Sequence, residues 1–550
     1  MVEHHLEVER KYEFVGGDGE PTHVDWSALD GYSVQKPVEE HLEASYFDTA
    51  DNDLSRNLVA LRRRLGGYDQ GWHIKFDDRA GARHEMHFDL LADEMKMPAR
   101  VSKFVRSVTL GDELHEIVSL ITDRIRTVLK DSNGVSVAEI CQDAVHAHDF
   151  STGIERQWNE WEIELLESGE KSPAEIFADC EKILFEAGAK PSKSPAKIAR
   201  ALGQDGEFEA RRQGKTLSDE QLVKKTKKND KKNKRRVQDT APQDSSELLQ
   251  HVLHMLTSNL MLWELKFRAG TPETVHGMRI GTRQIQSVLR YAVRPYVKNE
   301  VEAEAVEQLI GSLKKLMKGL SSARDIDILT DFLGSVEVRP GLVSEKSREE
   351  LEEYLALDDE DASKSVLRLL DSEEYLKLRV ALIELTQNLD MAVTLPLNAE
   401  NFVNKVAKRI RKHLSSFLKA DYKDLWELNP SAFAYDEVHN DVLFEIRRDA
   451  QAARYCLEAF EIAGIKLSKD HKKLRNYAGE LHREISILSD ENVVVRWLER
   501  SSRRAMNHQS DRLGIGYLLG RSSYYAVGLR MTQHSFVPAE LKRIKKLDLK

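Results

Sequence analysis

Acidic and basic side chains recur at every second position in several short segments of the first 205 residues. Glu7, Glu9 and Lys11 have this spacing, and so do the carboxylates of segment 160–165. Side chains two residues apart lie on the same face of a β-strand. Clustered carboxylates suit hard cations such as Mg²⁺ or Mn²⁺, whereas arginine and lysine suit phosphate oxygens. The two residue types on one face therefore predict a site for metal ions and a phosphorylated anion.

Apolar residues occupy the opposite faces of these segments, as Trp72, Ile74 and Phe76 illustrate. On a single strand such alternation usually marks an ordinary solvent-exposed face. Because it recurs on five or more segments, we expect a closed antiparallel β-barrel with apolar faces outside and charged faces lining a tunnel. Covering helices are expected near 98–107 and 172–188. Clustered carboxylates would repel one another in an empty tunnel, so divalent cations are expected among them.

The 550 residues divide into three segments by composition, which predicts an α+β chain. Residues 1–205 carry the strand pattern. Residues 206–243 are expected to be a flexible linker, because the run 224–236 has nine basic residues and one acidic residue and like charges keep a chain extended. The linker could serve as a solubilising spacer or as a tether for a polyanion. Residues 244–550 have apolar residues three and four apart, which predicts an all-helical bundle.

Composition also indicates the cellular compartment and limits the classes of partner that we expect. The three cysteines, Cys141, Cys180 and Cys456, are far apart and fit a reducing compartment. No apolar run approaches the roughly 18 residues of a membrane span, and the first residues lack an apolar leader. We therefore expect a cytoplasmic protein with no membrane partner. The net charge of −10 argues against a nucleic-acid partner, and the oligomeric state stays open.

Basic residues line one face of a predicted helix in each half of the third segment. The first half carries His276, Arg279, Arg283 and Arg290 at positions i, i+3, i+7 and i+14, which share a helix face. Arg447 and Arg454 repeat the i, i+7 spacing in the second half. One such stripe is ordinarily a solvated face, but matching stripes predict an internal two-fold repeat and one basic groove for a long polyanion.

The first segment resembles the CYTH superfamily, the triphosphate tunnel metalloenzymes. Its motifs occur here in order: Glu7-Val8-Glu9-Arg10-Lys11, Tyr46-Phe47-Asp48-Thr49, Leu61-Arg62-Arg63-Arg64, Lys75, Glu160-Trp161-Glu162-Ile163-Glu164-Leu165 and Lys197-Ile198-Ala199-Arg200-Ala201-Leu202. Ala196 stands where serine is common in the family. The resemblance covers about residues 3–203 and implies a metal-dependent triphosphatase that uses Mg²⁺ or Mn²⁺.

The resemblance also implies roles for individual residues. The catalytic set is Glu7, Glu9 and Lys11. The phosphate chain would be held by Lys11, Arg62, Arg64, Lys75, Arg83, Arg124, Arg126 and Lys197. The metal ligands would be Glu7, Glu9, Glu160, Glu162, Glu164 and Asp143. Glu85 and Glu139 are expected to be salt-bridge partners within the tunnel.

The third segment resembles the CHAD domain over about residues 245–530. Segment 275–283 looks like its V-H-x-x-R-x-x-x-R helix, and segment 320–327 looks like its L-G-x-x-R-D-x-D turn. The resemblance implies that inorganic polyphosphate binds at His276, Arg279, Arg283, Arg290, Lys315, Lys318, Arg324, Arg447, Arg448 and Arg454. Gln286, Phe444, Gln451 and Glu484 depart from the family pattern and leave the groove less basic than usual.

These features predict hydrolysis of inorganic triphosphate in the barrel and polyphosphate binding in the helical domain. Inorganic triphosphate is favoured because residues 1–205 carry no motif that reads a base or ribose. Two alternatives stay open. One is a triphosphatase for an organic triphosphate such as ATP or thiamine triphosphate, and the other is a catalytically silent scaffold that binds polyphosphate or its cytoplasmic granules.

Overall fold

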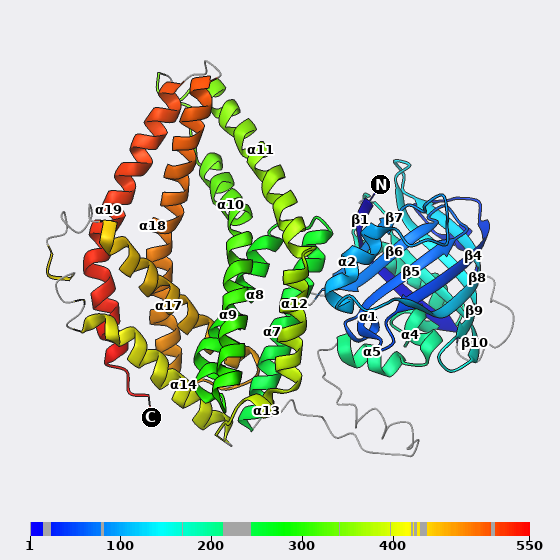
Figure 1. Cartoon of the computed structure of the whole chain (residues 1–550). Coiled ribbons are helices and arrows are strands. Elements are labelled where there is room, and N and C mark those ends of the chain that lie inside the picture. The colour runs from blue at the N-terminus through cyan, green and yellow to red at the C-terminus, as the bar shows by residue number, and fades with distance from the viewer. Residues whose placement is uncertain are drawn as a thin grey trace. The chain divides into compact units, whose positions relative to one another are not determined.

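The computed structural model describes residues 2–14, 24–78, 82–167, 169–212, 244–339, 341–396, 398–419, 422, 426–428, 437–507 and 512–549. The chain forms two compact units, Met1–Arg235 and Arg236–Lys550 (Figure 1). The first seven residues of the expected linker lie in helix α5 (Asp205–Arg212), which packs on the first unit through the buried Phe208. The rest of that linker, 213–243, lies outside the described residues.

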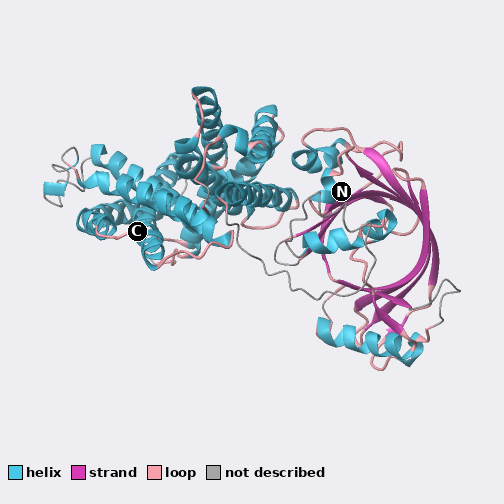
Figure 2. Cartoon of the chain, turned by 90° about the horizontal axis from the view of Figure 1, so that it is seen from below, coloured by secondary structure: helices cyan, strands magenta, loops and turns pink. Residues whose placement is uncertain are grey.

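The first unit is an antiparallel sheet whose strands curve around a central space (Figure 2). The strands are β1 (Val2–Glu7), β2 (Glu9–Phe14), β3 (Ser33–Val34), β4 (Val38–Asp48), β5 (Val59–Leu65), β6 (Gly71–Asp77), β7 (Arg83–Phe88), β8 (His115–Lys130), β9 (Ser136–Asp149), β10 (Ile154–Leu165) and β11 (Ala189–Pro191). Their order is β1-β7-β6-β5-β4-β8-β9-β10-β2-β11, and β3 pairs with β8.

The prediction of a closed barrel was wrong in one respect, because the ladder of hydrogen-bonded strands does not close. β1 pairs with β7 at one side, and β2 pairs with β10 at the other. These two strands follow one another along the chain, separated only by Val8, and therefore lie end to end instead of side by side. One continuous N-terminal segment thus carries both sides of the sheet, and it places Glu7, Glu9 and Lys11 beside strands that are far apart in the sequence.

Helices cover the outer face of the sheet as expected. Helix α2 (Ala99–Thr109) packs Phe104 against Phe76 and Phe88 of the sheet. Helix α3 (Pro173–Glu186) begins at a Ser172 capping box and buries its apolar side against β9 and β10. Such burial of apolar area is the main favourable term that fixes the helices to the sheet. The short elements α1 (Asp53–Arg56) and η1 (Trp26–Ala28) complete this unit.

Helix α4 (Lys197–Leu202) packs against the opposite, inward face of the sheet. Ile198, Ala199 and Ala201 form one buried apolar cluster with inward side chains of β4, β8, β9 and β10. The central space is therefore apolar where α4 packs and polar beyond it. Lys197, the first residue of α4, lies at the boundary and is the only residue of this helix that contacts the carboxylates described below among the ion pairs of the described residues.

The second unit is all-helical. Its helices are α7 (Ser245–Arg268), α8 (Thr274–Val288), α9 (Glu300–Gly319), α10 (Ser321–Gly334), α11 (Glu345–Leu370), α12 (Glu373–Gln387), α13 (Leu389–Ala392), α14 (Ala399–Leu414), α17 (Glu437–Ile462), α18 (Lys469–Asn507) and α19 (Arg512–Lys545), with short turns η2 (Leu289–Val293), η3 (Arg294–Tyr296) and η4 (Ser415–Leu418). Helices α8 and α17, which carry the two similar motifs, pack against each other. Among the described helices, none is long and apolar enough to cross a bilayer.

Candidate functional site

The inward faces of the strands carry charged side chains that are largely shielded from water. Strand alternation explains this placement, because each inward carboxylate on β10 is followed by an outward apolar residue that packs under a helix. Trp161 and Ile163 of β10 belong to the outer core with α3. The inward Glu160 and Glu162 are 1% and 8% exposed. Buried charges of this kind require partners of opposite sign.

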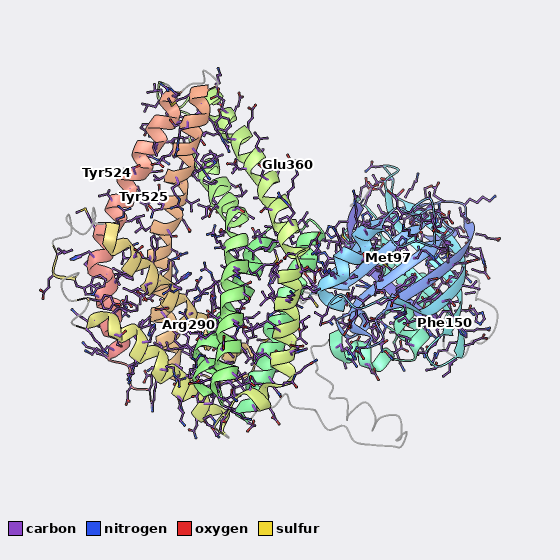
Figure 3. All side chains as sticks on the ribbon, viewed as in Figure 1. Met97, Phe150, Arg290, Glu360, Tyr524 and Tyr525 are labelled. Carbon is purple, nitrogen blue, oxygen red and sulfur yellow. The ribbon has the colours of Figure 1, made fainter. Side chains whose placement is uncertain are left out.

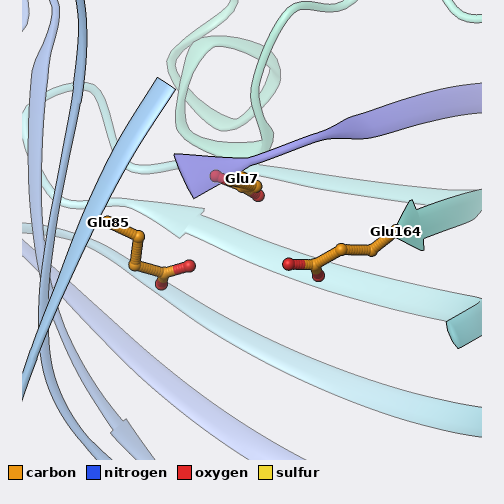
Figure 4. Close-up of side chains that lie close together, drawn as sticks. All are labelled: Glu7, Glu85 and Glu164. Carbon is orange, nitrogen blue, oxygen red and sulfur yellow. The ribbon is translucent and has the colours of Figure 1, made fainter. Parts of the chain in front are cut away.

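Three carboxylates from different strands converge on one point of the interior. Glu7 of β1, Glu85 of β7 and Glu164 of β10 each offer an oxygen within 4.8 Å of the others (Figure 4). Lys75 of β6 lies 2.9 Å from Glu7 and 3.0 Å from Glu85. Arg83 lies 3.3 Å from Glu7. We call Glu7, Glu85 and Glu164 the first carboxylate group.

The members of the first carboxylate group differ in their readiness to ionise. Burial raises the pKa of Glu164 to about 8, and the nearby Glu7, Glu9 and Glu85 add to the effect beyond what Lys75 offsets. Burial also opposes ionisation of Glu7, but the charges of Lys75 and Arg83 lower its pKa to about 2. A third ionised carboxylate at this point would therefore need further positive charge.

A second carboxylate group consists of Asp143 of β9 with Glu160 and Glu162 of β10, again within 4.8 Å of one another. Lys197 lies 2.9, 2.6 and 2.5 Å from these three side chains, in that order. Arg124 holds Asp143 through two hydrogen bonds of 2.7 Å and lies 3.1 Å from Glu162. Burial opposes ionisation of Asp143 and Glu162, but these cations lower the pKa of both carboxyls.

Glu9 and Lys11 of β2 lie between the two carboxylate groups and share ion-pair partners with them. Arg83 lies 2.5 Å from Glu9, and Lys11 lies 3.2 Å from Glu9 while it also pairs with Glu162. Burial opposes the charge of Lys11, but Glu162 and Glu9 raise its pKa well above the ordinary value. The structure thus brings together all six predicted metal ligands and the predicted phosphate contacts Lys11, Lys75, Arg83, Arg124 and Lys197.

The remaining predicted phosphate contacts have anionic partners of their own. Arg62 lies 3.6 Å from Glu85, and Arg126 lies 3.1 Å from Glu40 and 3.3 Å from Glu139. Arg64 pairs with Asp69, in the turn between β5 and β6. In this turn Gly66 and Gly67 have φ of +79° and +76° and lie against β4, where a Cβ on Gly66 would come within 2.2 Å of the His41 carbonyl oxygen. Only glycine fits this position.

Sequence reasoning missed several participants. Asp69 gave no signal because it lies in a turn and not in the alternating pattern. Its neighbour Tyr68 stacks on Arg126, with the guanidinium carbon 4.5 Å from the ring centre, and donates a 3.3 Å hydrogen bond to Glu139. Glu85 was expected to be only a salt-bridge partner, although its same-face spacing with Arg83 places it in the first carboxylate group. His73 hydrogen-bonds Glu85 at 2.9 Å.

The helical unit gathers basic side chains, and Asp325, Asp327 and Asp490 are carboxylates near them. Burial lowers the pKa of Arg283 to about 9, and the charges of Arg279 and Arg447 add to this effect. Burial and Arg324 likewise lower the pKa of Arg279 to about 10. Burial and neighbouring like charges both oppose the positive charge of these guanidinium groups. We call Arg279, Arg283, Arg324 and Arg447 the arginine cluster.

Three members of the arginine cluster donate hydrogen bonds to neutral acceptors. Arg283 donates to the amide oxygen of Gln451, and Arg447 donates a 2.9 Å hydrogen bond to the Ser486 hydroxyl. Arg279 donates to the backbone oxygen of Met317 at 3.3 Å. Arg324 is the member with an anionic contact, 3.5 Å from Asp490. Neutral acceptors hold the guanidinium groups in place and leave their charge for another anion.

The other predicted polyphosphate contacts are not members of the arginine cluster, and several of them form ion pairs with nearby carboxylates. Arg290, labelled in Figure 3, lies 2.9 Å from the buried Asp449, which His413 also contacts. Arg454 lies 2.7 Å from Glu458, and Arg448 lies 3.5 Å from Glu445. His276 is near Arg324, and burial together with that charge lowers its pKa. Lys315 and Lys318 lie on the exposed side of α9.

Comparisons with known proteins agree with both resemblances. Residues 5–201 match the CYTH domain, and residues 247–500 match the CHAD domain. Uncharacterized proteins from two strains of Mycobacterium tuberculosis are 26% identical over 504 residues, which cover 89% of this chain and 88% of theirs.

Solved structures with similar parts include a CHAD domain from the plant Ricinus communis, at 20% identity over 57% of this chain and 96% of that one, with a TM-score of 0.37. Another is an adenylyl-cyclase-like protein of Hippeastrum described as having a dominant triphosphatase activity. It is 19% identical over 38% of this chain and 98% of its own, with a TM-score of 0.24. The chain belongs to the proteins that join a CYTH domain to a CHAD domain.

Proposed function

We propose that residues 1–205 hydrolyse inorganic triphosphate with the help of a divalent cation and that residues 244–550 bind inorganic polyphosphate. The observation that supports the first activity is the shared interior of two carboxylate groups and at least five cationic side chains. Phosphoryl transfer depends mainly on positioning and charge neutralisation, so this arrangement supplies what the reaction needs.

The donor set fits Mg²⁺ or Mn²⁺. Each group offers three carboxylate oxygens within 4.8 Å of one another, and such cations prefer oxygen ligands. Glu164, whose pKa is raised to about 8 by burial and by neighbouring carboxylates, indicates a place where extra positive charge is accommodated. Glu7, Glu85 and Glu164 would hold one ion, and Asp143, Glu160 and Glu162 would hold a second. A bound ion would neutralise phosphate oxygens and lower the pKa of a coordinated water.

The protein's own cations bind and orient the phosphate chain. Lys75 and Arg83 flank the first carboxylate group, whereas Arg124 and Lys197 flank the second. Lys11 touches the second group and Glu9 and so joins the two regions. Without substrate, these cations pair with carboxylates; phosphate oxygens would replace part of that pairing. Burial strengthens each of these charge interactions relative to water.

The arginine cluster supports the second activity, because four guanidinium groups share a partly buried region with Asp490 as the carboxylate in contact. A linear polyphosphate carries negative charge along its whole length and would relieve their repulsion. Such binding releases counterions and falls steeply with salt. Such binding would localise the protein to polyphosphate granules in the cytoplasm.

Phosphate release from tripolyphosphate, compared with ATP and long-chain polyphosphate, tests the catalytic proposal. We expect turnover of tripolyphosphate with Mg²⁺ or Mn²⁺ and its loss in EDTA, because the carboxylates alone repel the substrate. Faster turnover of ATP would instead support an organic triphosphate as substrate. No turnover of any substrate, with polyphosphate binding retained, would support a scaffold.

A change at Asp69 is expected to improve apparent substrate affinity. This carboxylate pairs with Arg64, and although burial opposes its ionisation, Arg64 and Arg62 lower its pKa. It therefore competes with phosphate for Arg64. Asp69→Asn should lower KM for tripolyphosphate about three- to tenfold, the range expected for one charge-assisted contact, with kcat little changed. Asp112→Asn, at an exposed turn, is the control. A raised KM would mean that Asp69 positions Arg64 for the substrate.

A further inference from the structure

His482 of α18 lies at the arginine cluster, because Arg447 and Arg283 act on its ring. Its ring centre is 6.5 Å from that of Tyr455, and its backbone oxygen accepts a hydrogen bond from Ser486, the residue that also receives the bond from Arg447. Nε2 of His482 is buried and makes no hydrogen bond within the described part of the chain. A buried ring nitrogen without a partner costs free energy unless a ligand satisfies it.

The charged groups with the largest effect on His482 are arginines, and two of them have acidic neighbours, Glu458 beside Arg454 and Asp490 near Arg447. Helix α8 contributes Arg283, α17 contributes Arg447 and Arg454 beside Tyr455, and α18 itself contributes Arg483. Burial lowers the pKa of His482 to about 3, and the four arginines add to this effect. The imidazole is therefore neutral near neutral pH when the cluster holds no anion.

A neutral imidazole has a physical advantage at this position. The arginine cluster already places four guanidinium groups close together, and burial with the charges of Arg279 and Arg447 lowers the pKa of Arg283. Another fixed cation would raise the repulsion further and destabilise the empty domain. A neutral histidine adds no charge while the cluster is empty. When anions bind, protonation gives its ring a positive charge and a second N–H donor.

We propose that His482 is a proton-dependent contact for polyphosphate, neutral in the empty arginine cluster and protonated when phosphate oxygens enter it. The inference rests on the proposed binding of polyphosphate by the helical unit. Entering phosphates reverse the sign of the local potential, so that imidazolium becomes favoured and Nε2–H donates to a phosphate oxygen. Binding would then take up one proton from solution.

The sign of the pH effect follows from linkage. Because the bound state holds more protons than the free state, affinity rises as the pH falls through the pKa of His482 in the complex. The effect ends near the free-state pKa of about 3. One coupled proton changes the affinity by at most about tenfold per pH unit.

Calorimetric titration of the full chain with long-chain polyphosphate tests this inference. Titrations at pH 5.5, 6.5 and 7.5, at constant ionic strength and in two buffers of different ionisation enthalpy, give both affinity and proton uptake. We expect uptake approaching one proton and binding about tenfold or more tighter at pH 5.5 than at 7.5, from linkage. His482→Gln should take up about one proton fewer than the wild type and show a weaker pH dependence, because His276 remains, whereas His251→Gln on α7 should match the wild type.

The outcomes separate this inference from the proposed function. Equal pH dependence in the wild type and in His482→Gln would overturn the role of His482 while leaving polyphosphate binding intact. No binding at any pH, even at low salt, would overturn the proposed function and this inference together. Should His482→Gln fail to fold, an NMR titration of His482 in the wild type decides the question: an imidazole that stays neutral at pH 5.5 with polyphosphate bound would contradict it.

Discussion

Glu162→Gln should reduce kcat for tripolyphosphate about 10²- to 10³-fold, the range seen when one group that neutralises transition-state charge is lost. Glu162 is the carboxylate on which Lys11, Arg124 and Lys197 converge. Glutamine keeps the shape of the side chain but loses the charge, and it offers a weaker oxygen to a hard cation. The substitution therefore removes a metal ligand and releases three cations from their shared partner.

The kinetic pattern distinguishes this role from simple substrate binding. A phosphate contact alone would change KM, whereas a group needed for charge neutralisation in the reaction lowers kcat. Metal dependence gives a second readout, since the residual activity should need a higher Mg²⁺ or Mn²⁺ concentration. Glu43→Gln is the matched control, because Glu43 is an exposed carboxylate on β4. Far-UV circular dichroism confirms that both variants fold.

Unchanged kcat in Glu162→Gln, with an intact fold, would mean that the second carboxylate group is not part of the reaction. The same measurement on Glu7→Gln then asks whether the first carboxylate group acts alone. If neither substitution alters turnover, the carboxylates serve only to neutralise the buried cations, and the catalytic proposal fails.

The spacing of charged residues along each strand predicted which side chains point into the interior of the sheet, because alternation depends only on neighbouring residues. Two carboxylates that are two residues apart on a strand lie on the same face, so Glu160 and Glu162 could be placed inside from the sequence alone. Helices α2 (Ala99–Thr109) and α3 (Pro173–Glu186) likewise confirmed the expected covering helices. The sequence could not predict that the hydrogen-bonded sheet stays open, because this depends on β1 pairing with β7 while β2 pairs with β10.

Residues that act through distant partners could not be predicted in the same way. The pairing of Arg290 with Asp449 joins positions 159 apart in the chain, so the basic stripe gave no hint that this arginine has a buried partner. His482 acquires most of its charged environment from Arg283 of α8 and from Arg447 and Arg454 of α17, which lie far from it in the sequence or on another helix. The pattern indicates which face a residue occupies, whereas its partner across the core depends on the packing of whole helices.

The arginine cluster should bind polyphosphate at the expense of the stability of the empty domain. Arg283→Met with Arg447→Met removes two buried like charges while keeping most of the apolar volume. Polyphosphate affinity should fall about 10²- to 10³-fold, since each charge-assisted contact contributes about 1.5–3 kcal/mol and such losses are not fully additive. The salt dependence should weaken by nearly two counterions. Thermal unfolding of the ligand-free chain should nevertheless move to higher temperature.

This opposition between affinity and stability is what separates a binding site from an ordinary structural cluster. The pKa of Arg283, lowered to about 9 by burial and by Arg279 and Arg447, indicates that these guanidinium groups repel one another in the empty domain. Removing them therefore relieves strain only if no anionic partner within the fold needs them. Arg348→Met with Arg368→Met, on α11, is the control and should leave affinity unchanged. A loss of both affinity and stability in the Arg283 and Arg447 variant would show that the cluster holds the helices together instead of awaiting an anion.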